Sequence, residues 1–304
     1  MAGSSRKVIF AALIGNAGIA VMKFVASAFT GSSAMFSEGI HSVVDTGNQI
    51  LLLLGLNRAS KPADRKFPYG HGKEIYFWSF VVAILIFAVG SGLAIFKGSE
   101  HILHPQVITD PVWNYGVLTL AIIIECAFFI VAIKEFNKIK GQRGYLEAIR
   151  KGKDPGMFVV LLEDAAALMG LVVAMAGIAI SQLTGNYVYD GVASILIGLI
   201  LASIAALLAY ETKGLLIGES ADDGVVQGIR KIVTTFPGVE RVNEVLTMHV
   251  GPEYILVNLS VEFNDEIRTQ QMEKVISSID SEIKKNYSNV KRVFIEAESW
   301  KFTF

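Results

Sequence analysis

One apolar segment of the chain carries an unusual series of polar side chains. Within the run Ser33–Leu56, Glu38, His41, Asp45 and Asn48 follow one another at intervals of three, four and three positions. This spacing places all four on one face of a helix, with His41 and Asp45 one turn apart. An imidazole nitrogen and a carboxylate at that separation can bind one divalent cation. The first hypothesis is therefore a metal site on a helix.

A second apolar run contains two adjacent carboxylates, Glu163 and Asp164. Neighbouring residues on a helix point about 100° apart, so at most one of the two can face the same site as His41 and Asp45. Three ligand-type side chains on two helices favour metal binding over structural hydrogen bonding. The structural alternatives are that His41 is a neutral hydrogen-bond donor between helices and that Asp45 pairs with Lys23.

The elements that must position these residues are membrane-spanning helices. The chain has 304 residues, of which 52% are hydrophobic and 18% charged, and its mean hydropathy is +0.49. Soluble proteins contain about 25% charged residues, so the composition argues against a soluble enzyme and against a disordered chain. A spanning helix needs about 20 mostly apolar residues. Six windows meet this requirement: Val8–Phe29, Ser33–Leu56, Phe77–Glu100, Val112–Lys134, Met157–Gln182 and Val188–Tyr210.

Basic residues lie at one end of these windows. The basic residues lie at the N-terminus, between the second and third windows, between the end of the fourth window and the fifth, and just after the sixth. The three opposite loops contain no Lys or Arg. Lys23 lies within the first window, and Lys97 lies near the end of the third. The positive-inside rule therefore predicts a multi-pass protein with both termini in the cytoplasm. Because no cleavable signal or targeting run precedes the first window, we expect a bacterial inner membrane. The binding partners that these residues predict are the lipid bilayer and a metal ion.

Other polar residues in the windows indicate weaker roles. Asn16 and Lys23 lie seven positions apart on one helical face and can close polar contacts between helices. Glu125 is isolated, and we expect it to be structural or conformational. Asp190 lies at the start of the sixth window, where the N-terminus of its own helix favours an anion.

Charge and cysteine content exclude several functions. The net charge is −1, so there is no basic excess for binding nucleic acid. The single cysteine, Cys126, cannot form a disulfide within the chain or a thiolate zinc cluster.

The chain changes character near residue 212, so we expect a transmembrane transport domain over residues 1–212 and a cytoplasmic domain over residues 213–304. The hydrophobic spacing there predicts an αββαβ order that suits an open sheet with helices on one face. The predicted elements are Gly224–Phe236, Arg241–Val250, Tyr254–Phe263, Thr269–Tyr287 and Val290–Glu296. About 80 residues is a marginal size for a lone domain, and dimerisation would help to stabilise it.

Two motifs resemble those of the cation diffusion facilitators. One is His41-Ser-Val-Val-Asp45, preceded by Thr30-Gly-Ser-Ser-Ala-Met, and the other is Pro62-Ala-Asp-Arg-Lys-Phe-Pro-Tyr-Gly-His-Gly-Lys-Glu74. The six windows and the αββαβ tail agree, so the resemblance covers essentially the whole chain. It implies a polytopic α-helical membrane protein with six transmembrane helices and a metallochaperone-like tail, usually a homodimer. Its activity would be export of zinc or a related divalent ion in exchange for protons, with the metal as substrate, no cofactor and no enzyme reaction.

The resemblance also implies a set of transport-site ligands. The family's site takes two residues from the second span and two from the fifth, and the members of each pair are four positions apart. His41 and Asp45 match the first pair, and Asp164 matches the second member of the other pair. The first member of that pair falls on Val160, which cannot bind a metal.

The fourth ligand therefore stays open between Glu163, Asn48 and a water molecule. The stretch Leu161-Leu-Glu-Asp164, together with His41, is similar to the branch of the family that includes mitochondrial zinc carriers.

Members of the family often have a second metal site in the loop after the second span. Asp64 and His71 match two of its ligand positions, and the third position, commonly histidine, is Phe67 here. Lys73 matches a lysine of a charge interlock, with Glu219 or Asp222 as its partner. The alternative is that Lys73 is a snorkelling surface lysine.

The tail lacks the histidines of the better-studied zinc members. The matching positions are Asn243 and Asn258, with Glu296 and Glu298 near the end, and His249 is the only tail histidine. This pattern favours a weak carboxylate site or a structural dimer contact over a tight zinc cluster.

Rival functions differ in class. One imidazole with two or three oxygens favours zinc, and Mn²⁺, Co²⁺ or Fe²⁺ are the alternative substrates. A membrane metal sensor would bind ions without moving them, and a passive channel would need a hydrated pore. An intramembrane aspartyl protease needs two facing aspartates, and Tyr189-Asp190 fits only one half of such a site.

Overall fold

The computed structural model describes the backbone of residues 2–108 and 111–299, and the side chains from residue 13 onward except at 111 and 139. The chain divides into two compact units. The first comprises Met1–Asn57 and Ile75–Lys213, and the second comprises Arg58–Glu74 and Gly214–Phe304.

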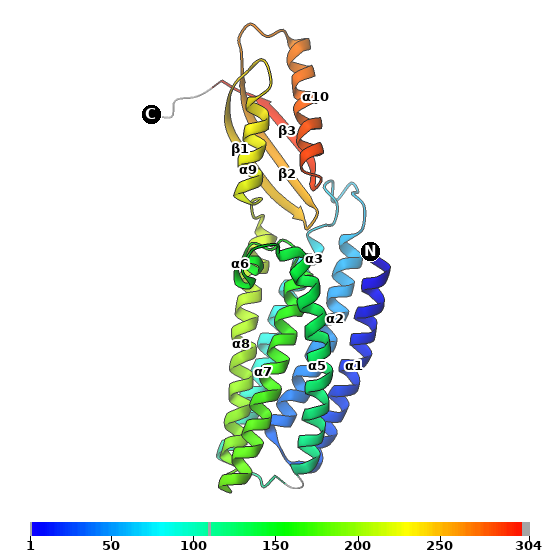
Figure 1. Cartoon of the computed structure of the whole chain (residues 1–304), viewed down its shortest axis with the longest axis vertical. Helices are drawn as coiled ribbons and strands as arrows, with labels where there is room; N and C mark the ends of the chain where they lie inside the picture. Colours follow the sequence, from blue (N-terminus) through cyan, green and yellow to red (C-terminus); the bar gives the residue numbers. More distant parts are fainter. Residues whose placement is uncertain (1, 109–110, 300–304) are drawn as a thin grey trace, which may run out of the picture. The chain divides into compact units, whose positions relative to one another are not determined.

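The first unit is a bundle of long helices (Figure 1). Along the described chain its elements are α1 (Ala2–Thr30), α2 (Ser33–Ala59), α3 (Glu74–Leu85), the π-helical segment η1 (Ile86–Ser91), α4 (Gly92–Leu103), α5 (Pro111–Lys140), α6 (Tyr145–Arg150), α7 (Pro155–Thr184) and α8 (Val188–Ile217). The elements α3, η1 and α4 run on without a break as one span of 30 residues.

Five helices are long and apolar enough to cross a membrane, judged on the described residues alone. They cover Leu13–Thr30, Glu74–Leu103, Val112–Lys138, Pro155–Thr184 and Val188–Ile217. The remaining predicted window corresponds to α2, which is a helix of 27 residues whose polar face lowers its hydropathy. The helices extend beyond the predicted windows because their ends continue into polar sequence. The short helix α6 and the π-helical segment η1 were not predicted.

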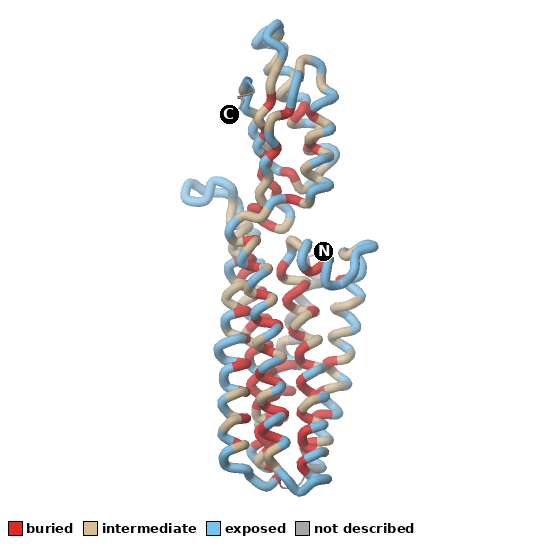
Figure 2. Tube along the Cα trace, turned by 90° about the vertical axis from the view of Figure 1, so that its left-hand side faces the viewer, coloured by how far each residue is buried: buried red, intermediate tan, exposed pale blue. Residues whose placement is uncertain are grey.

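The bundle exposes large apolar side chains and buries several charged and polar ones. Large apolar side chains such as Val21, Ile123 and Val172 are at least 60% exposed, whereas Lys23 and Glu38 are at most 1% exposed. In Figure 2 the buried positions run along the inner faces of the helices. This distribution is the one expected for a protein whose outer surface contacts lipid and whose interior polar groups carry the function.

The helices α4 and α8 approach each other closely. A Cβ atom on Gly98 would lie 2.6 Å from the Gly191 carbonyl oxygen, and one on Gly191 would lie 2.8 Å from the Gly98 carbonyl oxygen. Small residues allow this contact between backbones, which is common between helices in membranes. The contact sets the end of α4 beside the start of α8.

The second unit contains the predicted αββαβ order. Its elements are α9 (Asp223–Thr234), β1 (Val239–Gly251), β2 (Tyr254–Phe263), α10 (Thr269–Asn286) and β3 (Val290–Ala297). Strand β2 is central, antiparallel to β1 and parallel to β3. Alternate residues of β2, such as Val257 and Leu259, are buried with Ile229 of α9 and Ile279 of α10 in one core.

Two further features of the second unit bear on function. The segment Arg58–Glu74 packs in this unit, with Gly72 against the backbone at Val250 and Gly251. One row across the sheet pairs Leu246 with Asn258 and Asn258 with Phe294, and all three side chains are exposed. The sheet therefore keeps an uncovered, partly apolar face in the described chain.

Candidate metal site in the helix bundle

The polar residues of α2 lie together inside the bundle. Glu38, His41, Asp45 and Asn48 are all buried, with exposed fractions from 0% to 6%. His41 Nε2 lies 3.4 Å from Asp45 Oδ1, one helical turn away. The structure thus brings the imidazole and the carboxylate together as their spacing predicts.

Helix α7 contributes Glu163 to this polar face. Asn48 Nδ2 donates a hydrogen bond to Glu163 Oε1 at 2.6 Å. Glu163 is buried, whereas the neighbouring Asp164 is half-buried. The structure therefore places Glu163 in direct contact with α2.

Several buried polar atoms in this region have no hydrogen-bond partner within the described chain. They are Glu38 Oε1, His41 Nδ1, Asp45 Oδ1, Asn48 Oδ1 and Gln49 Oε1. A buried polar group without a partner costs about 1–3 kcal/mol, and a bound cation would satisfy such oxygen and nitrogen acceptors. The chemistry of these donor atoms fits a divalent cation as substrate.

The ligands do not form a closed coordination shell. No group of three or more His, Cys, Asp or Glu side chains among the described residues is close enough to hold one ion. The structure instead contains two linked pairs, His41 with Asp45 and Asn48 with Glu163.

Lys23 of α1 pairs with Glu38, which is not the partner expected from the sequence. Its Nζ donates to Glu38 Oε2 and to Ser42 Oγ, both at 2.9 Å. Asp45 was the expected alternative partner. A Cβ atom on Gly170 of α7 would collide with Glu38 Oε1, so the glycine makes room for this buried ion pair.

Asp190 lies in the first turn of α8, as expected, and its carboxylate also binds the N-terminus of α2. Its Oδ2 accepts hydrogen bonds from the backbone N–H groups of Ser33 at 2.5 Å and Ala34 at 3.2 Å. The Ser33 hydroxyl also donates to Oδ2, and the Ser32 hydroxyl donates to Oδ1. Asp190 therefore caps α2, the helix that carries His41 and Asp45. The serines before α2 are a recognisable cap signal, but nothing in the sequence names a partner 157 positions away.

The loop after α2 brings Asp64 and His71 together. His71 Nε2 lies 3.4 Å from Asp64 Oδ2, and the ring of Phe67 packs against the imidazole with 4.6 Å between centroids. The backbone N–H of Phe67 donates to Asp64 Oδ1 and holds the pKa of that carboxyl below its ordinary value. The pair supplies two ionisable ligand groups, and an aromatic side chain occupies the third position.

Two of the tail positions that match the family's metal site, Asn243 and Glu298, are joined by hydrogen bonds with Ser260. Asn243 Nδ2 donates to the Glu298 carbonyl at 2.9 Å and to Ser260 Oγ at 3.2 Å, and Ser260 Oγ donates to Glu298 Oε2 at 3.1 Å. Lys73 Nζ donates to the Leu216 carbonyl at 3.4 Å within the same unit.

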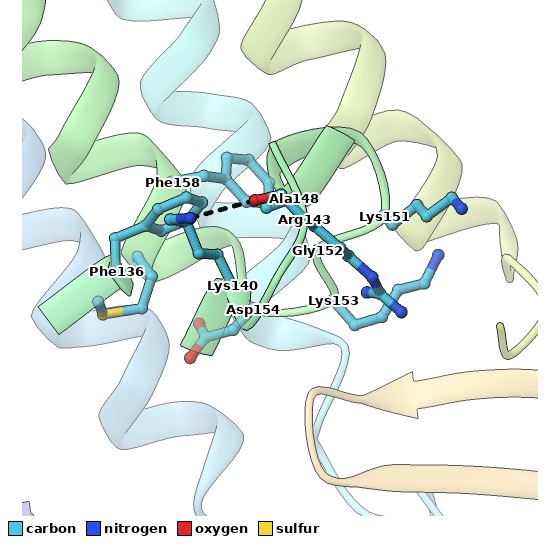
Figure 3. A pocket seen from close by; sticks show the side chains of 10 residues that line it. Phe136, Lys140, Arg143, Ala148, Lys151, Gly152, Lys153, Asp154 and Phe158 are labelled. Carbon is cyan, nitrogen blue, oxygen red and sulfur yellow. Dashed lines mark hydrogen bonds between the residues drawn. The ribbon is translucent and has the colours of Figure 1, made fainter. Parts of the chain in front are cut away.

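A cavity of about 170 Å³ lies where α5 and α7 are joined. In Figure 3 its cationic side chains gather around the short connecting segment, and Lys140 Nζ donates to the Arg143 carbonyl at 3.2 Å. The charged residues of the lining are Lys140, Arg143, Lys151, Lys153 and Asp154. Four cationic groups against one carboxylate repel a divalent cation, so this cavity does not suit the metal.

Comparison with known proteins gives matches over almost the whole chain. A family model described as the cation efflux transmembrane domain matches residues 9–217, and one described as the cation efflux protein, cytoplasmic domain, matches residues 221–300. The proton-coupled zinc antiporter SLC30A9, mitochondrial, of Xenopus laevis is 34% identical over 266 residues, which are 87% of this chain and 48% of that protein.

Two other relatives extend the comparison. The human protein of the same name is 32% identical over 87% of this chain and 47% of its own length. The manganese efflux system protein MneP of Bacillus subtilis is 24% identical over 97% of this chain and 96% of its own length. The chain thus spans about half the length of the zinc antiporters that it matches.

Proposed function

Because the chain belongs to the cation efflux family, the cation diffusion facilitators, we propose that it moves a divalent cation across a membrane in exchange for protons. Zn²⁺ is the proposed substrate. The observation that carries the proposal is the buried polar face of α2, with Glu163 of α7 against it, inside a bundle whose outer surface is apolar.

The proposed transport site contains His41, Asp45 and Asp164, with Glu163 as the fourth ligand. Asn48 supports Glu163 by its hydrogen bond and presents an unpaired Oδ1. The neutral Val160 leaves the fourth position of the family pattern without a ligand, and Glu163 reaches the α2 face from three positions further along α7. A second site at Asp64 and His71 is proposed as an auxiliary metal contact of two ligands.

Proton coupling follows from competition for the same atoms. A metal binds neutral imidazole and ionised carboxylates, so its binding releases protons and protonation expels it. With the site open to the cytoplasm, His41, Asp45 and the α7 carboxylates lose protons and take the metal. With the site open to the other side, protons displace the metal. Rocking of α2 and α7 against the remaining helices would provide alternating access around a site at mid-membrane depth.

The ligand chemistry and the names of the relatives support zinc as the substrate, with other divalent metal ions as alternatives. An imidazole with carboxylates suits Zn²⁺, whereas sites made entirely of oxygen ligands favour Mn²⁺. Two of the relatives are named zinc antiporters and one is named a manganese efflux protein. Mn²⁺, Co²⁺ and Fe²⁺ are therefore the alternative cargoes of the same mechanism.

We further propose a homodimer with both termini in the cytoplasm or in the matrix of an organelle. The exposed row Leu246, Asn258 and Phe294 on the sheet supplies an apolar face for a second copy of the chain. The membrane proposed from the sequence is a bacterial inner membrane. A mitochondrial membrane is the alternative, since the SLC30A9 relatives are named mitochondrial.

The test uses purified protein in vesicles that contain a zinc dye and a pH dye. A zinc gradient should drive zinc movement with opposed proton movement, and Asp45→Asn should abolish both. Asp265→Asn, a change of the same kind at an exposed position of the second unit, should behave as wild type. Zinc movement without protons would contradict the exchange. Zinc binding without movement would identify a sensor, and transport of Mn²⁺, Co²⁺ or Fe²⁺ instead would change only the substrate.

A further inference from the structure

A polar pocket opens at the end of the bundle where α1 turns into α2. Its volume is about 310 Å³, and its lining includes Ser32, Ser33, Glu100, His101 and His104. The two histidines differ in their surroundings, because His104 is exposed whereas His101 is only 6% exposed. The lining of the pocket thus combines one buried imidazole, that of His101, with one exposed imidazole, that of His104.

His101 lies beside the carboxylate that caps α2. Its Nε2 is 3.8 Å from Asp190 Oδ2 and has no hydrogen-bond partner among the described residues. The Gly98–Gly191 contact produces this arrangement, because it holds the last turn of α4 against the first turn of α8. Imidazole is a side chain that proteins often use to shuttle protons.

From Asp190 a series of serine hydroxyls runs into the bundle. Ser33 Oγ donates to Asp190 Oδ2 at 2.9 Å, and Ser194 Oγ donates to Ser33 Oγ at 3.1 Å. Ser194 Oγ and Ser37 Oγ are then 2.9 Å apart. All four side chains are buried. A hydroxyl both donates and accepts and rotates to suit its partners, so the series can pass a proton in either direction.

The series ends next to the proposed transport site. Ser37 directly precedes Glu38, whose Oε1 is a buried acceptor without a hydrogen-bond partner in the described part of the chain. His41 follows one turn further along the same helix. The series therefore leads from the pocket to the segment of α2 that carries the proposed ligands.

We propose that His101 and Asp190 form a proton-binding site, from which protons pass along the three serines toward Glu38. The proposal rests on the metal–proton exchange proposed above and assigns its route at this end of the bundle. A proton from water in the pocket adds to the imidazole and moves to the carboxylate. Each serine oxygen then accepts one proton and releases its own to the next, so every group returns to its starting state.

The charged groups around His101 agree with this role. Asp190 faces the ring from α8, while Lys97, Glu100 and His104 share the pocket from α4. Lys97 is engaged by Glu100 at 2.7 Å. The walls contributed by α1, α2 and the turn between them consist of serine, alanine, glycine and phenylalanine. The nearest ionic contact that the structure gives His101 is thus Asp190.

The experiment measures zinc transport in vesicles of known protein orientation, while the pH on the pocket side is varied and the other side is held constant. The wild-type rate should rise as this pH falls from about 8 to about 6, the range over which histidine takes up a proton. His101→Gln should lose most of this pH dependence. Its equilibrium zinc affinity should stay at the wild-type value, because the ligands of α2 and α7 are unchanged. His104→Gln, the matched change in the same pocket, should keep the wild-type profile.

A second variant tests the route rather than its outer site. Ser194→Ala interrupts the hydroxyl series without removing a titratable group, so it should slow proton movement at every pH while zinc still binds. Wild-type pH profiles and proton rates in both His101→Gln and Ser194→Ala would overturn the relay and leave the exchange intact. Zinc movement without protons in the wild-type protein would overturn the exchange and the relay together.

Discussion

At the scale of single residues, the site contains ligands that the sequence predicts and contacts between residues that only the structure reveals. His41 and Asp45 are in contact, and the two adjacent carboxylates of α7 differ in burial. Glu163 is buried against Asn48, whereas Asp164 is half-buried. Because one turn of α7 cannot direct both side chains at the same point, the two carboxylates should contribute unequally to metal binding.

Replacement of Glu163 tests its place as the fourth ligand. Glu163→Gln keeps an oxygen that can accept from Asn48 but removes the charge, and we expect zinc affinity to fall about 10- to 100-fold, as for changes close to other metal sites. Equilibrium zinc binding by the purified protein is the measurement. Glu135→Gln, at an exposed position of α5, is the matched control. Wild-type affinity in Glu163→Gln, with a loss in Asp164→Asn, would leave Asn48 or water as the fourth ligand.

Lys23 and Glu38 provide a prediction about stability. Loss of one partner leaves a buried charge without compensation, which costs about 3–5 kcal/mol. Lys23→Met should therefore lower the midpoint of thermal unfolding in detergent. Lys23→Met combined with Glu38→Gln should recover much of that loss, since neither position of the pair then carries a charge. If the single and double variants unfold at the same temperature, the pair does not stabilise the bundle.

At the scale of elements, close packing between α4 and α8 positions the groups at one end of the bundle. The contact between Gly98 and Gly191 sets His101 beside Asp190, and Asp190 in turn caps α2. A change in the distance between these two helices would therefore act on the helix that carries the metal ligands.

A single methyl group tests the α4–α8 contact. In Gly98→Ala the new Cβ would meet the Gly191 carbonyl oxygen at 2.6 Å, so the backbones must separate. Overpacking of this kind costs about 1–3 kcal/mol, and we expect a lower unfolding midpoint together with an altered pH dependence of transport. Gly116→Ala on α5 meets nothing within 4 Å and should be neutral or slightly stabilising. Equal midpoints for the two variants would show that the contact tolerates a side chain.

At the scale of the whole molecule, the proposed homodimer needs a surface on which two copies of the chain can meet. The second unit has its own core, formed by α9, α10 and one face of the sheet. The other face exposes Leu246 and Phe294 on either side of Asn258, in one row across the three strands. Exposed apolar side chains that are grouped together mark an interaction surface more often than scattered ones do.

The homodimer can be tested on this face. Leu246→Lys combined with Phe294→Lys places like charges where two copies would meet, so the full chain in detergent should shift from dimer to monomer. Light scattering coupled to size exclusion measures the mass directly. Glu273→Lys, at an exposed position of α10, adds a charge of the same sign away from this face and should leave the dimer intact. A dimer that survives the double change would place the interface elsewhere.

The sequence by itself determined the features that depend on residue order along one helix or strand. Hydropathy predicted the spans, the spacing from Glu38 to Asn48 predicted one polar face, and the spacing of hydrophobic residues predicted the αββαβ tail. Only the tertiary structure decided that Glu163 meets Asn48 and that Lys23 pairs with Glu38. It also decided that Asp190 caps a helix 157 positions away. These contacts depend on how each helix is rotated about its axis, which packing against distant segments sets and local spacing does not encode.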